Sequence, residues 1–417
     1  MYRRNIESAL QAALSDTRVV LLNGARQTGK STLAQKFADH LAGRYLSLDD
    51  ETLLGTARSD PSALVRGTVG LTVIDEVQKA PALFPAIKME VDRDRRPGRF
   101  LLTGSANVFL LPQLSESLAG RVEILPLQPL SQDELAGRKA SFPDVLFSEE
   151  AFQARKHAVN RLAICARIAG GGFPEALSRE PGARRTAWFR SYLSSLLQRD
   201  IRDLAHIEGL TDMPRLLALL AARTSALMNM SELSRSVGIA HSTLRRYLSL
   251  LEATFILQPL PAWSTNIGKR FVKSPKIHLV DTGLAAHLYG EPDPAQLAHS
   301  PALGPLLESF VLQEIRKQLG WSRLSAVPYH FRTAAGREVD IVLEAPGGRV
   351  AGIEVKAAGS VGKSDYAGLE ALAEAAGTKF IRGVVLYLGE HAVPHSDRLW
   401  AVPIDELWRQ AGQSTSV

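Results

Sequence analysis

The chain has almost no cysteine and no long hydrophobic run. Cys165 is the one cysteine among 417 residues, so an internal disulfide and a zinc site built from several cysteines are excluded. No apolar run approaches the roughly 18 residues that cross a bilayer. Arg3 and Arg4 are followed by an acid and not by the apolar segment of a signal peptide. These absences predict a cytoplasmic protein with no membrane contact.

Positive charge exceeds negative charge only slightly. The formal net charge is +6 and the pI is near 9.4, which suits an anionic partner such as nucleic acid and equally suits simple solubility. Hydrophobic residues make up 45% and charged residues 22%, as in ordinary soluble globular proteins. At ~100–200 residues per domain, the length predicts about two to four domains. Composition alone does not distinguish a nucleic-acid-binding protein from an ordinary soluble one, so the function must be read from motifs.

The most informative motif is the segment Gly24–Ser31, which matches the phosphate-loop pattern G-x-x-x-x-G-K-[ST]. It follows the apolar run Val19–Leu22, which predicts a strand, and it leads into a predicted helix from Lys30 to Leu41. Backbone N–H groups of such a loop wrap phosphate oxygens at the positive end of the helix. We expect Lys30 to reach the β- and γ-phosphates of a nucleotide and the Ser31 hydroxyl to ligate Mg²⁺. The predicted nucleotide-binding residues here are Gly24, Ala25, Arg26, Gln27, Thr28, Gly29, Lys30, Ser31 and Thr32.

Two further strand patterns end in polar side chains. The run 71–76 ends in two acids, of which Asp75 is expected to hold the metal through water and Glu76 to activate the attacking water. Adjacent acids favour hydrolysis over binding alone. The run 99–107 ends near Ser105 and Asn107, either of which is placed to sense a γ-phosphate. Strands alternate with helices from about residue 19 to 129, which predicts a parallel sheet with helices on both faces.

Two arginines are candidates for stabilising charge on the transferred phosphoryl group. Arg121 follows the third strand within the nucleotide-binding domain and is preferred over Arg199 for that reason. Either residue would act within one subunit or across the interface of a homo-oligomer. Each is also compatible with a purely structural ion pair.

The order of loop, acidic strand and polar-tipped strand resembles AAA-type P-loop ATPases. Other segments extend this resemblance over roughly residues 1–408, to one prokaryotic family of AAA-type ATPases that carry a C-terminal domain of unknown function. The resemblance implies ATP as the nucleotide and a prokaryotic cytoplasmic setting. The segments that carry it are Leu118–Arg121, Gly171–Glu175, Gln198–Ile201, Lys269–Lys276 and Asp281–Ala285.

Residues 230–251 have the arrangement of a helix-turn-helix. Ser231 is expected to cap the first helix, Gly238 to form the turn, and a second helix to begin near His241 or Ser242. After it, Phe255–Leu257 and the basic segment 269–276 are expected to form the strands and loop of a winged helix, which serves either as a nucleic-acid contact or as a packing lid. The predicted nucleic-acid-binding residues are Ser242, Thr243, Arg245, Arg246, Lys269, Arg270, Lys273 and Lys276.

A second chemical pattern lies near the carboxyl end. Asp340 and the pair Glu354 and Lys356 fall on two segments joined by a Pro-Gly-Gly turn, which predicts a β-hairpin with its acids on one side and Asp340 towards the turn. The spacing resembles the PD-(D/E)xK nuclease core, with Glu308 on an upstream helix and Val339 in place of the usual proline. The resemblance implies that Asp340 and Glu354 ligate metal, with Glu308 in support, and that Lys356 orients the nucleophile. A salt-bridged surface hairpin is the alternative.

We therefore predict an α/β protein of four parts. These are an AAA-type P-loop ATPase domain over residues 1–130, a helical linker or lid over 131–205, a winged-helix domain over 206–290 and a restriction-endonuclease-like α/β domain over 291–417.

Three functions are compatible with this organisation, and all require ATP and Mg²⁺. The first is an ATP-hydrolysing switch coupled to a nuclease-like module acting on nucleic acid, with DNA favoured over RNA. The second is an ATP-dependent DNA-binding or regulatory protein with an inactive nuclease fold. The third is a signalling or toxin-like ATPase that binds protein.

Overall fold

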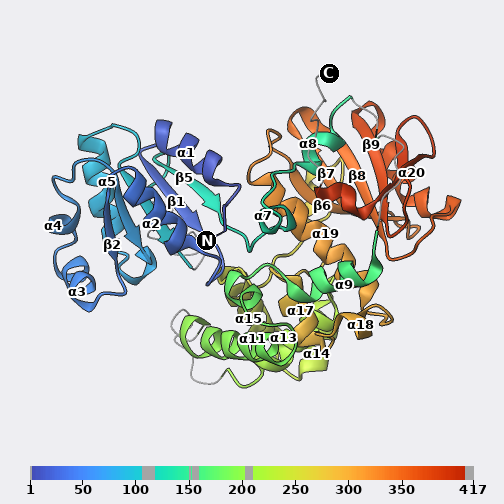
Figure 1. Cartoon of the computed structure of the whole chain (residues 1–417), viewed down its shortest axis with the longest axis horizontal. Coiled ribbons are helices and arrows are strands. Elements are labelled where there is room, and N and C mark those ends of the chain that lie inside the picture. Colours follow the sequence, from blue (N-terminus) through green and yellow to red (C-terminus); the bar gives the residue numbers. More distant parts are fainter. Residues whose placement is uncertain (1, 106–117, 150–151, 153–158, 202–209, 409–417) are drawn as a thin grey trace.

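The computed structural model describes residues 2–105, 118–149, 152, 159–201 and 210–408. Figure 1 shows one lobe built from the amino-terminal part, a second lobe around the carboxyl-terminal sheet, and a helical region beside both. Across the described residues, every helix is too short or too polar to cross a membrane.

The amino-terminal lobe contains a five-stranded sheet in which every neighbouring pair is parallel. The predicted parallel sheet is therefore confirmed. All strands end at the same edge, so the segments that follow them meet there. In spatial order the strands are β2 (Arg44–Ser47), β3 (Thr72–Asp75), β4 (Phe100–Gly104), β1 (Val19–Asn23) and β5 (Val122–Pro126).

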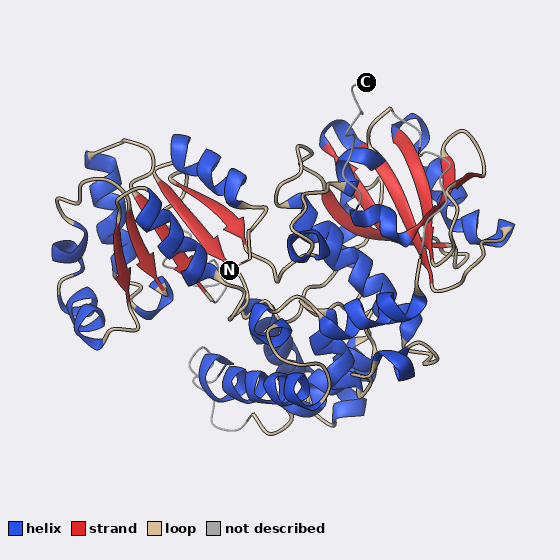
Figure 2. Ribbon diagram, in the orientation of Figure 1, coloured by secondary structure: helices blue, strands red, loops and turns tan. Residues whose placement is uncertain are grey.

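Helices cover both faces of this sheet, as Figure 2 shows. The side chains of β1 alternate between the two faces: Val20 and Leu22 enter one apolar core while Val19 and Leu21 enter the other. Because both faces are buried, β1 reads as a continuous apolar run. The first core contains residues of α1 (Glu7–Asp16) and α2 (Lys30–His40), and the second contains residues of α3 (Glu51–Ser59), α4 (Pro61–Val65) and α5 (Leu83–Arg93).

The chain next packs against the carboxyl-terminal lobe. Two short helices, α7 (Gln132–Leu135) and α8 (Phe142–Leu146), lie beside α19 (Leu303–Leu319). The Phe142 backbone N–H donates to Gln318 Oε1 at 2.7 Å, and Phe142 shares one core with strands of the distant sheet. The predicted linker over 131–205 thus contributes to two regions of the molecule.

The helical region begins at residue 161 and has an aromatic core. Trp188, Phe189 and Tyr192 are buried, and the rings of Trp188 and Tyr192 stack with centroids 5.1 Å apart. These side chains are core residues, as their helical spacing predicts. The region comprises α9 (Arg161–Gly170), α10 (Pro174–Leu177), α11 (Ala183–Ser195), a π-helical segment (Leu196–Ile201), α13 (Met213–Ala222), α14 (Met230–Val237), α15 (His241–Ala253), α16 (Ile267–Val272), α17 (Thr282–Tyr289) and α18 (Pro294–Leu297).

Two of the glycine-containing segments that carry the family resemblance meet in this region. A Cβ on Gly283 would lie 2.9 Å from the Gly171 nitrogen, so α17 approaches the end of α9 more closely than a side chain allows. Asp281 Oδ2 accepts from the Gly172 N–H at 2.6 Å and its Oδ1 accepts from the Leu284 N–H at 2.9 Å. These segments are therefore structural joints between helices.

The helix-turn-helix is present at the predicted place, with one correction. Gly238 has φ +82° and ends α14, and α15 begins at His241. The cap of α14 is Asn229, whose side chain accepts from the Glu232 N–H at 3.1 Å, so the prediction of Ser231 as the cap is wrong. Asn229 is the better cap because its side-chain oxygen reaches an amide that has no partner within the helix.

The segments that were expected to complete a winged helix form only isolated β-bridges. Leu257 and Leu260 form isolated antiparallel bridges with Leu279 and Lys276. Part of the predicted basic loop forms the short helix α16.

The carboxyl-terminal lobe is built on a six-stranded mixed sheet, which confirms a second α/β unit (Figure 2). One face packs on α19 and the other on α20 (Ala367–Ala376). The predicted hairpin is formed by β7 and β8, which are antiparallel and joined by the turn 346–348. In spatial order the strands are β10 (Val393–Pro394), β11 (Leu399–Pro403), β9 (Phe380–Tyr387), β8 (Arg349–Lys356), β7 (Glu338–Ala345) and β6 (Val327–Arg332).

Candidate nucleotide site and acidic cluster

The phosphate-loop segment lies between β1 and α2, at the edge where the parallel strands end. A Cβ on Gly24 would lie 2.2 Å from the Leu127 carbonyl oxygen, and Gly29 has φ +95°, so both positions require glycine. Lys30 is buried, and its Nζ donates to the carbonyls of Gly24 at 3.0 Å and Ala25 at 2.9 Å. The loop thus holds its lysine inside the curve where phosphate oxygens would lie.

Asp75 is surrounded by three hydroxyl donors. Its Oδ1 accepts from Ser31 Oγ at 3.0 Å and from Thr103 Oγ1, and its Oδ2 accepts from Tyr45 OH at 2.9 Å. Ser31 and Asp75, the two predicted metal ligands, are therefore in direct contact. A hydroxyl and a carboxylate at this separation fit a hydrated Mg²⁺, which takes few protein oxygens and keeps several waters.

Tyr45 was not predicted from the sequence as part of the site. It comes from β2, which pairs with β3 so that Tyr45 lies opposite Val73 and Ser47 opposite Asp75. Burial and the neighbouring Asp75 charge raise the pKa of Tyr45 well above its ordinary value. Its hydroxyl therefore stays protonated and donates to Asp75. The sequence gives no signal for this contact because β2 is short and has no motif.

Glu76 has φ +58°, in the left-handed region that non-glycine residues rarely adopt. Its backbone N–H donates to Thr103 Oγ1 at 3.0 Å, and its Oε2 accepts from Ser105 Oγ at 2.9 Å and from Gln78 Nε2. The predicted base and the predicted phosphate sensor Ser105 are thus in contact. Gln78 is an addition that sequence reasoning missed, and Asn107 lies outside the described residues.

Arg4 connects the phosphate loop to the next segment of the chain. Its guanidinium donates to the carbonyls of Thr28 and Gln128, both at 2.7 Å, and to Glu134 Oε1 at 3.0 Å. Arg4 and Glu134 are both buried, and Glu134 also forms a capping box with Ser131 at the start of α7. Nothing in the local sequence near Arg4 predicts these contacts, because all its partners are distant in the chain.

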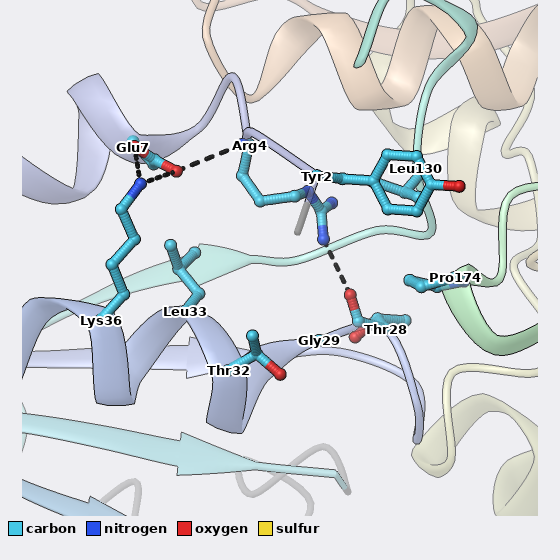
Figure 3. Close-up of a pocket in the computed structure, with 10 residues that line it drawn as sticks. All are labelled: Tyr2, Arg4, Glu7, Thr28, Gly29, Thr32, Leu33, Lys36, Leu130 and Pro174. Carbon is cyan, nitrogen blue, oxygen red and sulfur yellow. Dashed lines mark hydrogen bonds and ion pairs between the residues drawn. The ribbon is translucent and has the colours of Figure 1, made fainter. Parts of the chain in front are cut away.

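A cavity of about 180 Å³ adjoins the loop (Figure 3). Gly29, Thr32 and Leu33 line one side and Tyr2 lines another. Of the predicted nucleotide-binding residues, Thr28, Gly29 and Thr32 thus line this cavity. The remaining lining residues are Arg4, Glu7, Thr28, Lys36, Leu130 and Pro174.

Arg121 lies at the end of the sheet where the parallel strands begin, whereas the phosphate loop lies at the end where they finish. It precedes β5, whose first residue Val122 pairs with Val19, while the loop follows Asn23 at the other end of β1. Four residues of strand place these ends about 13 Å apart. The Arg121 guanidinium makes a two-point contact with Asp92, Nε to Oδ1 at 2.6 Å and Nη2 to Oδ2 at 2.9 Å. A role within its own nucleotide site is therefore excluded by position. The side chain of Arg199 lies outside the described part of the structure.

The four predicted carboxyl-terminal site residues do come together. Glu354 and Lys356 are alternate residues on β8 and contact each other at 2.8 Å. Asp340 Oδ2 accepts from the Val355 N–H at 3.0 Å, and Glu308 on α19 contacts the same group through a shared lysine. Asp340 lies beyond the Ile341–Ile353 pair, away from the turn. The prediction that it lies towards the turn is wrong, because the strands pair over more residues than the motif covers.

The shared lysine is Lys276, which was predicted to face phosphates. Its side chain is 2% exposed, and its Nζ lies 2.9 Å from Glu308 Oε1, 2.8 Å from Glu338 Oε1 and 2.9 Å from Asp340 Oδ1. Burial alone would lower the pKa of Lys276, but the charges of Asp340, Glu308 and Glu338 raise it above its ordinary value. The expectation that Lys276 binds nucleic acid is therefore wrong.

The other predicted nucleic-acid residues divide into two sets. Arg270 is paired with Glu344, Nη1 to Oε2 at 2.5 Å and Nη2 to Oε1 at 2.9 Å, beside the rings of Trp263 and Tyr329. Its position is explained by these contacts. The remaining predicted residues are exposed or half-buried: Ser242, Thr243, Arg245, Arg246, Lys269 and Lys273.

The parallel sheet, the glycine-dependent loop and the Ser31–Asp75 contact define an AAA-type P-loop ATPase. The AAA domain family model matches residues 16–136. Two domains of unknown function match the rest, DUF8612 over residues 162–295 and DUF4143 over residues 303–407.

The chain belongs to the family of an uncharacterized protein of Mycobacterium tuberculosis. The two are 34% identical over 411 residues, which is 97% of this chain and 84% of the relative. An uncharacterized protein of Mycobacterium bovis gives the same values. A further uncharacterized protein, from Haemophilus influenzae, is 23% identical over 305 residues, or 66% of this chain and 70% of the relative.

Among solved structures, the RuvB Holliday junction branch migration motor of Thermotoga maritima is similar to this chain. It is 20% identical, with a TM-score of 0.30, over 62% of this chain and 89% of that one. A score this low supports no conclusion about function or assembly.

Proposed function

We propose that the amino-terminal lobe hydrolyses ATP with Mg²⁺. The observation that supports this most strongly is the contact of Ser31 Oγ with Asp75 Oδ1 at 3.0 Å beside the buried Lys30. When bound, Mg²⁺ would neutralise charge on the β- and γ-phosphates. Ser31 and Asp75 would hold it, directly and through water.

The other residues take separate roles in this proposal. Lys30 exchanges its two loop carbonyls for phosphate oxygens when the triphosphate binds. Glu76 accepts a proton from the attacking water, and Ser105 and Gln78 release its carboxylate as the γ-phosphate arrives. The contacts that hold Glu76 without nucleotide would then limit wasteful turnover.

The nucleotide base is proposed to enter the cavity beside Gly29, Thr32 and Leu33 (Figure 3). Its volume of about 180 Å³ is below the ~300 Å³ of pockets that enclose a whole drug-sized ligand. The cavity therefore suits one ring system, with the triphosphate outside it in the loop. Tyr2 supplies an aromatic face next to the base.

Substitution of Lys30 and Glu76 tests the ATPase proposal. Lys30→Ala is expected to abolish nucleotide binding, because it removes the buried ammonium that the Gly24 and Ala25 carbonyls hold inside the loop. Glu76→Gln is expected to bind ATP and to turn it over at least about a hundredfold more slowly, as for loss of a general base. Phosphate release measures turnover and filter binding measures retained ATP. Unchanged turnover in both variants would refute the assignment.

Arg121 is proposed to act on the nucleotide of a second copy of the chain. It lies at the end of the sheet that its own nucleotide cannot reach, and its side chain is 28% exposed while paired with Asp92. Arg121→Ala and Lys30→Ala subunits, each inactive alone, are then expected to regain turnover when mixed. Failure of the mixture together with a monomeric state by light scattering would contradict this role.

We further propose that α15 contacts nucleic acid, with DNA preferred over RNA. Leu244, Tyr247 and Leu248 face the core, whereas Arg245 and Arg246 are exposed. The exposed residues share one face of the helix, as a groove-binding helix requires. Replacing Arg245 with Ala should weaken binding and reduce its salt dependence by about one counterion. Fluorescence anisotropy at several salt concentrations measures both.

For the carboxyl-terminal lobe we propose that it binds nucleic acid and does not cleave the phosphodiester bond. The buried Lys276 among the acids supports this choice over an active nuclease. Single- and double-stranded DNA and RNA should stay intact with ATP and with Mg²⁺ or Mn²⁺ varied independently. Cleavage by the wild type that is lost in Lys356→Ala would contradict this proposal and indicate an active nuclease. A complete absence of nucleic-acid binding would instead favour a protein partner.

A further inference from the structure

The acidic cluster of the carboxyl-terminal lobe contains its own cation. We propose that the Lys276 ammonium takes the place of a divalent metal ion among Glu308, Glu338 and Asp340, and thereby fastens the helical region to the carboxyl-terminal sheet. The four residues Lys276, Glu308, Glu338 and Asp340, here called the clasp, would then be a metal-free ionic contact between two parts of the chain. It does not depend on the proposed ATPase activity.

The geometry of the contacts is the first support. An ammonium group has three N–H donors, and Lys276 Nζ has one acidic partner for each, at 2.9, 2.8 and 2.9 Å. Glu338 and Asp340 are alternate residues of β7 and share one face, while Glu308 comes from α19 on that side of the sheet. The ammonium thus lies at the point where the carboxylates converge.

Burial is the second support. The Lys276 side chain is 2% exposed, and those of Glu308 and Asp340 are 13% and 12% exposed. A buried ammonium is tolerated only when paired and hydrogen-bonded. A divalent ion entering the cluster would displace Lys276 and leave its charge buried without partners.

The backbone holds Lys276 in this position. Its N–H donates to the Leu260 carbonyl at 2.9 Å, and its carbonyl accepts from the Leu260 N–H at 3.0 Å. A further antiparallel bridge joins Lys276 to Leu227, just before α14. The ammonium is therefore delivered by a paired segment of the helix-turn-helix region, so the clasp joins that region to the carboxyl-terminal sheet.

The remaining charges in the cluster are also balanced. Glu354 is paired with Lys356 at 2.8 Å. Each of the four acids, Glu308, Glu338, Asp340 and Glu354, therefore has a lysine ammonium within contact distance.

Manganese binding to the nucleotide-free full chain tests the proposal. The Asp75→Asn background removes the carboxylate that would hold Mn²⁺ beside the phosphate loop, and the electron paramagnetic resonance signal of free Mn²⁺ measures uptake. No uptake is expected in this background. Adding Lys276→Met vacates the position, and stoichiometric Mn²⁺ uptake is expected, lost again when Asp340→Asn is also introduced. The matched control is Lys269→Met, which replaces an exposed lysine on α16 and should show no Mn²⁺ uptake.

Two outcomes would overturn the proposal. One is stoichiometric Mn²⁺ uptake by Asp75→Asn alone that Asp340→Asn abolishes, since the cluster would then hold metal with Lys276 present. The other is a well-folded Lys276→Met variant that takes up no Mn²⁺. If Lys276→Met unfolds, Mn²⁺-dependent recovery of its melting transition is the expected readout, and the Asp75→Asn measurement still decides whether the native cluster binds metal.

Discussion

Replacing Tyr45 with phenylalanine removes one hydroxyl from the nucleotide site and nothing else. Tyr45 OH donates to Asp75 Oδ2 at 2.9 Å, while Asp75 Oδ1 keeps Ser31 and Thr103 as donors. A hydrogen bond to a charged group contributes about 1.5–3 kcal/mol. Because two donors remain and the Tyr45 side chain is only half-buried, we expect the lower end, about 1.5 kcal/mol, which is roughly tenfold in rate.

The effect should appear in the metal dependence of turnover. Tyr45 does not line the cavity proposed for the base, so the KM for ATP should change little. The kcat should fall about tenfold, and the Mg²⁺ concentration for half-maximal rate should rise, because Asp75 loses one of the three donors that fix its orientation. Phosphate release titrated with Mg²⁺ measures both.

A matched control is Tyr289→Phe on α17, in the helical region, which should leave kcat and the Mg²⁺ dependence unchanged. Equal effects of the two substitutions would indicate general destabilisation. A Tyr45→Phe variant with wild-type kcat and Mg²⁺ dependence would refute the assigned role of Tyr45.

Three further predictions concern stability. Arg4→Met leaves the buried Glu134 carboxylate without its cation and should lower the free energy of unfolding by about 3 kcal/mol and weaken ATP binding, measured by urea unfolding and calorimetry; an unchanged stability would contradict the connecting role of Arg4. Burial and the nearby Glu314 charge raise the pKa of Asp133 from 3.8 to about 7, so its stabilising contribution is complete below pH ~4 and is lost as pH rises through 7. Asp133→Asn should therefore gain stability relative to wild type between pH 4 and 8, by at most about 4 kcal/mol, whereas parallel pH profiles would contradict the assigned pKa. Gly283→Ala places a Cβ 2.9 Å from the Gly171 nitrogen and should cost about 1–3 kcal/mol; a neutral effect in thermal unfolding would refute the close approach.

Local patterns predicted the nucleotide-binding lobe well. The spacing of glycines, Lys30 and Ser31 is set by the shape of a phosphate, and the apolar strands around them are short and continuous because both faces are buried. The parallel sheet and the second α/β unit followed from the same strand and hairpin patterns. The loop contacts of Arg4 did not, because its partners lie as far as 130 residues away.

The carboxyl-terminal site shows where sequence patterns mislead. Glu308, Asp340, Glu354 and Lys356 come together as their spacing implies, yet the cation among the acids is a lysine assigned to a different surface. A run of basic residues on a sequence is typical of a solvated or phosphate-binding face. The pairing of Lys276 with Leu260 turns it inward, and this depends on tertiary contacts that no local pattern reports.

Calorimetric titration of MgATP into the folded full chain tests the central claim most directly. A saturable heat of binding is predicted for the wild type and none for Lys30→Ala, whose loop interior has lost its cation. Absence of heat from the wild type, or equal heats from both proteins, would contradict the assignment of the Gly24–Ser31 loop as a nucleotide site.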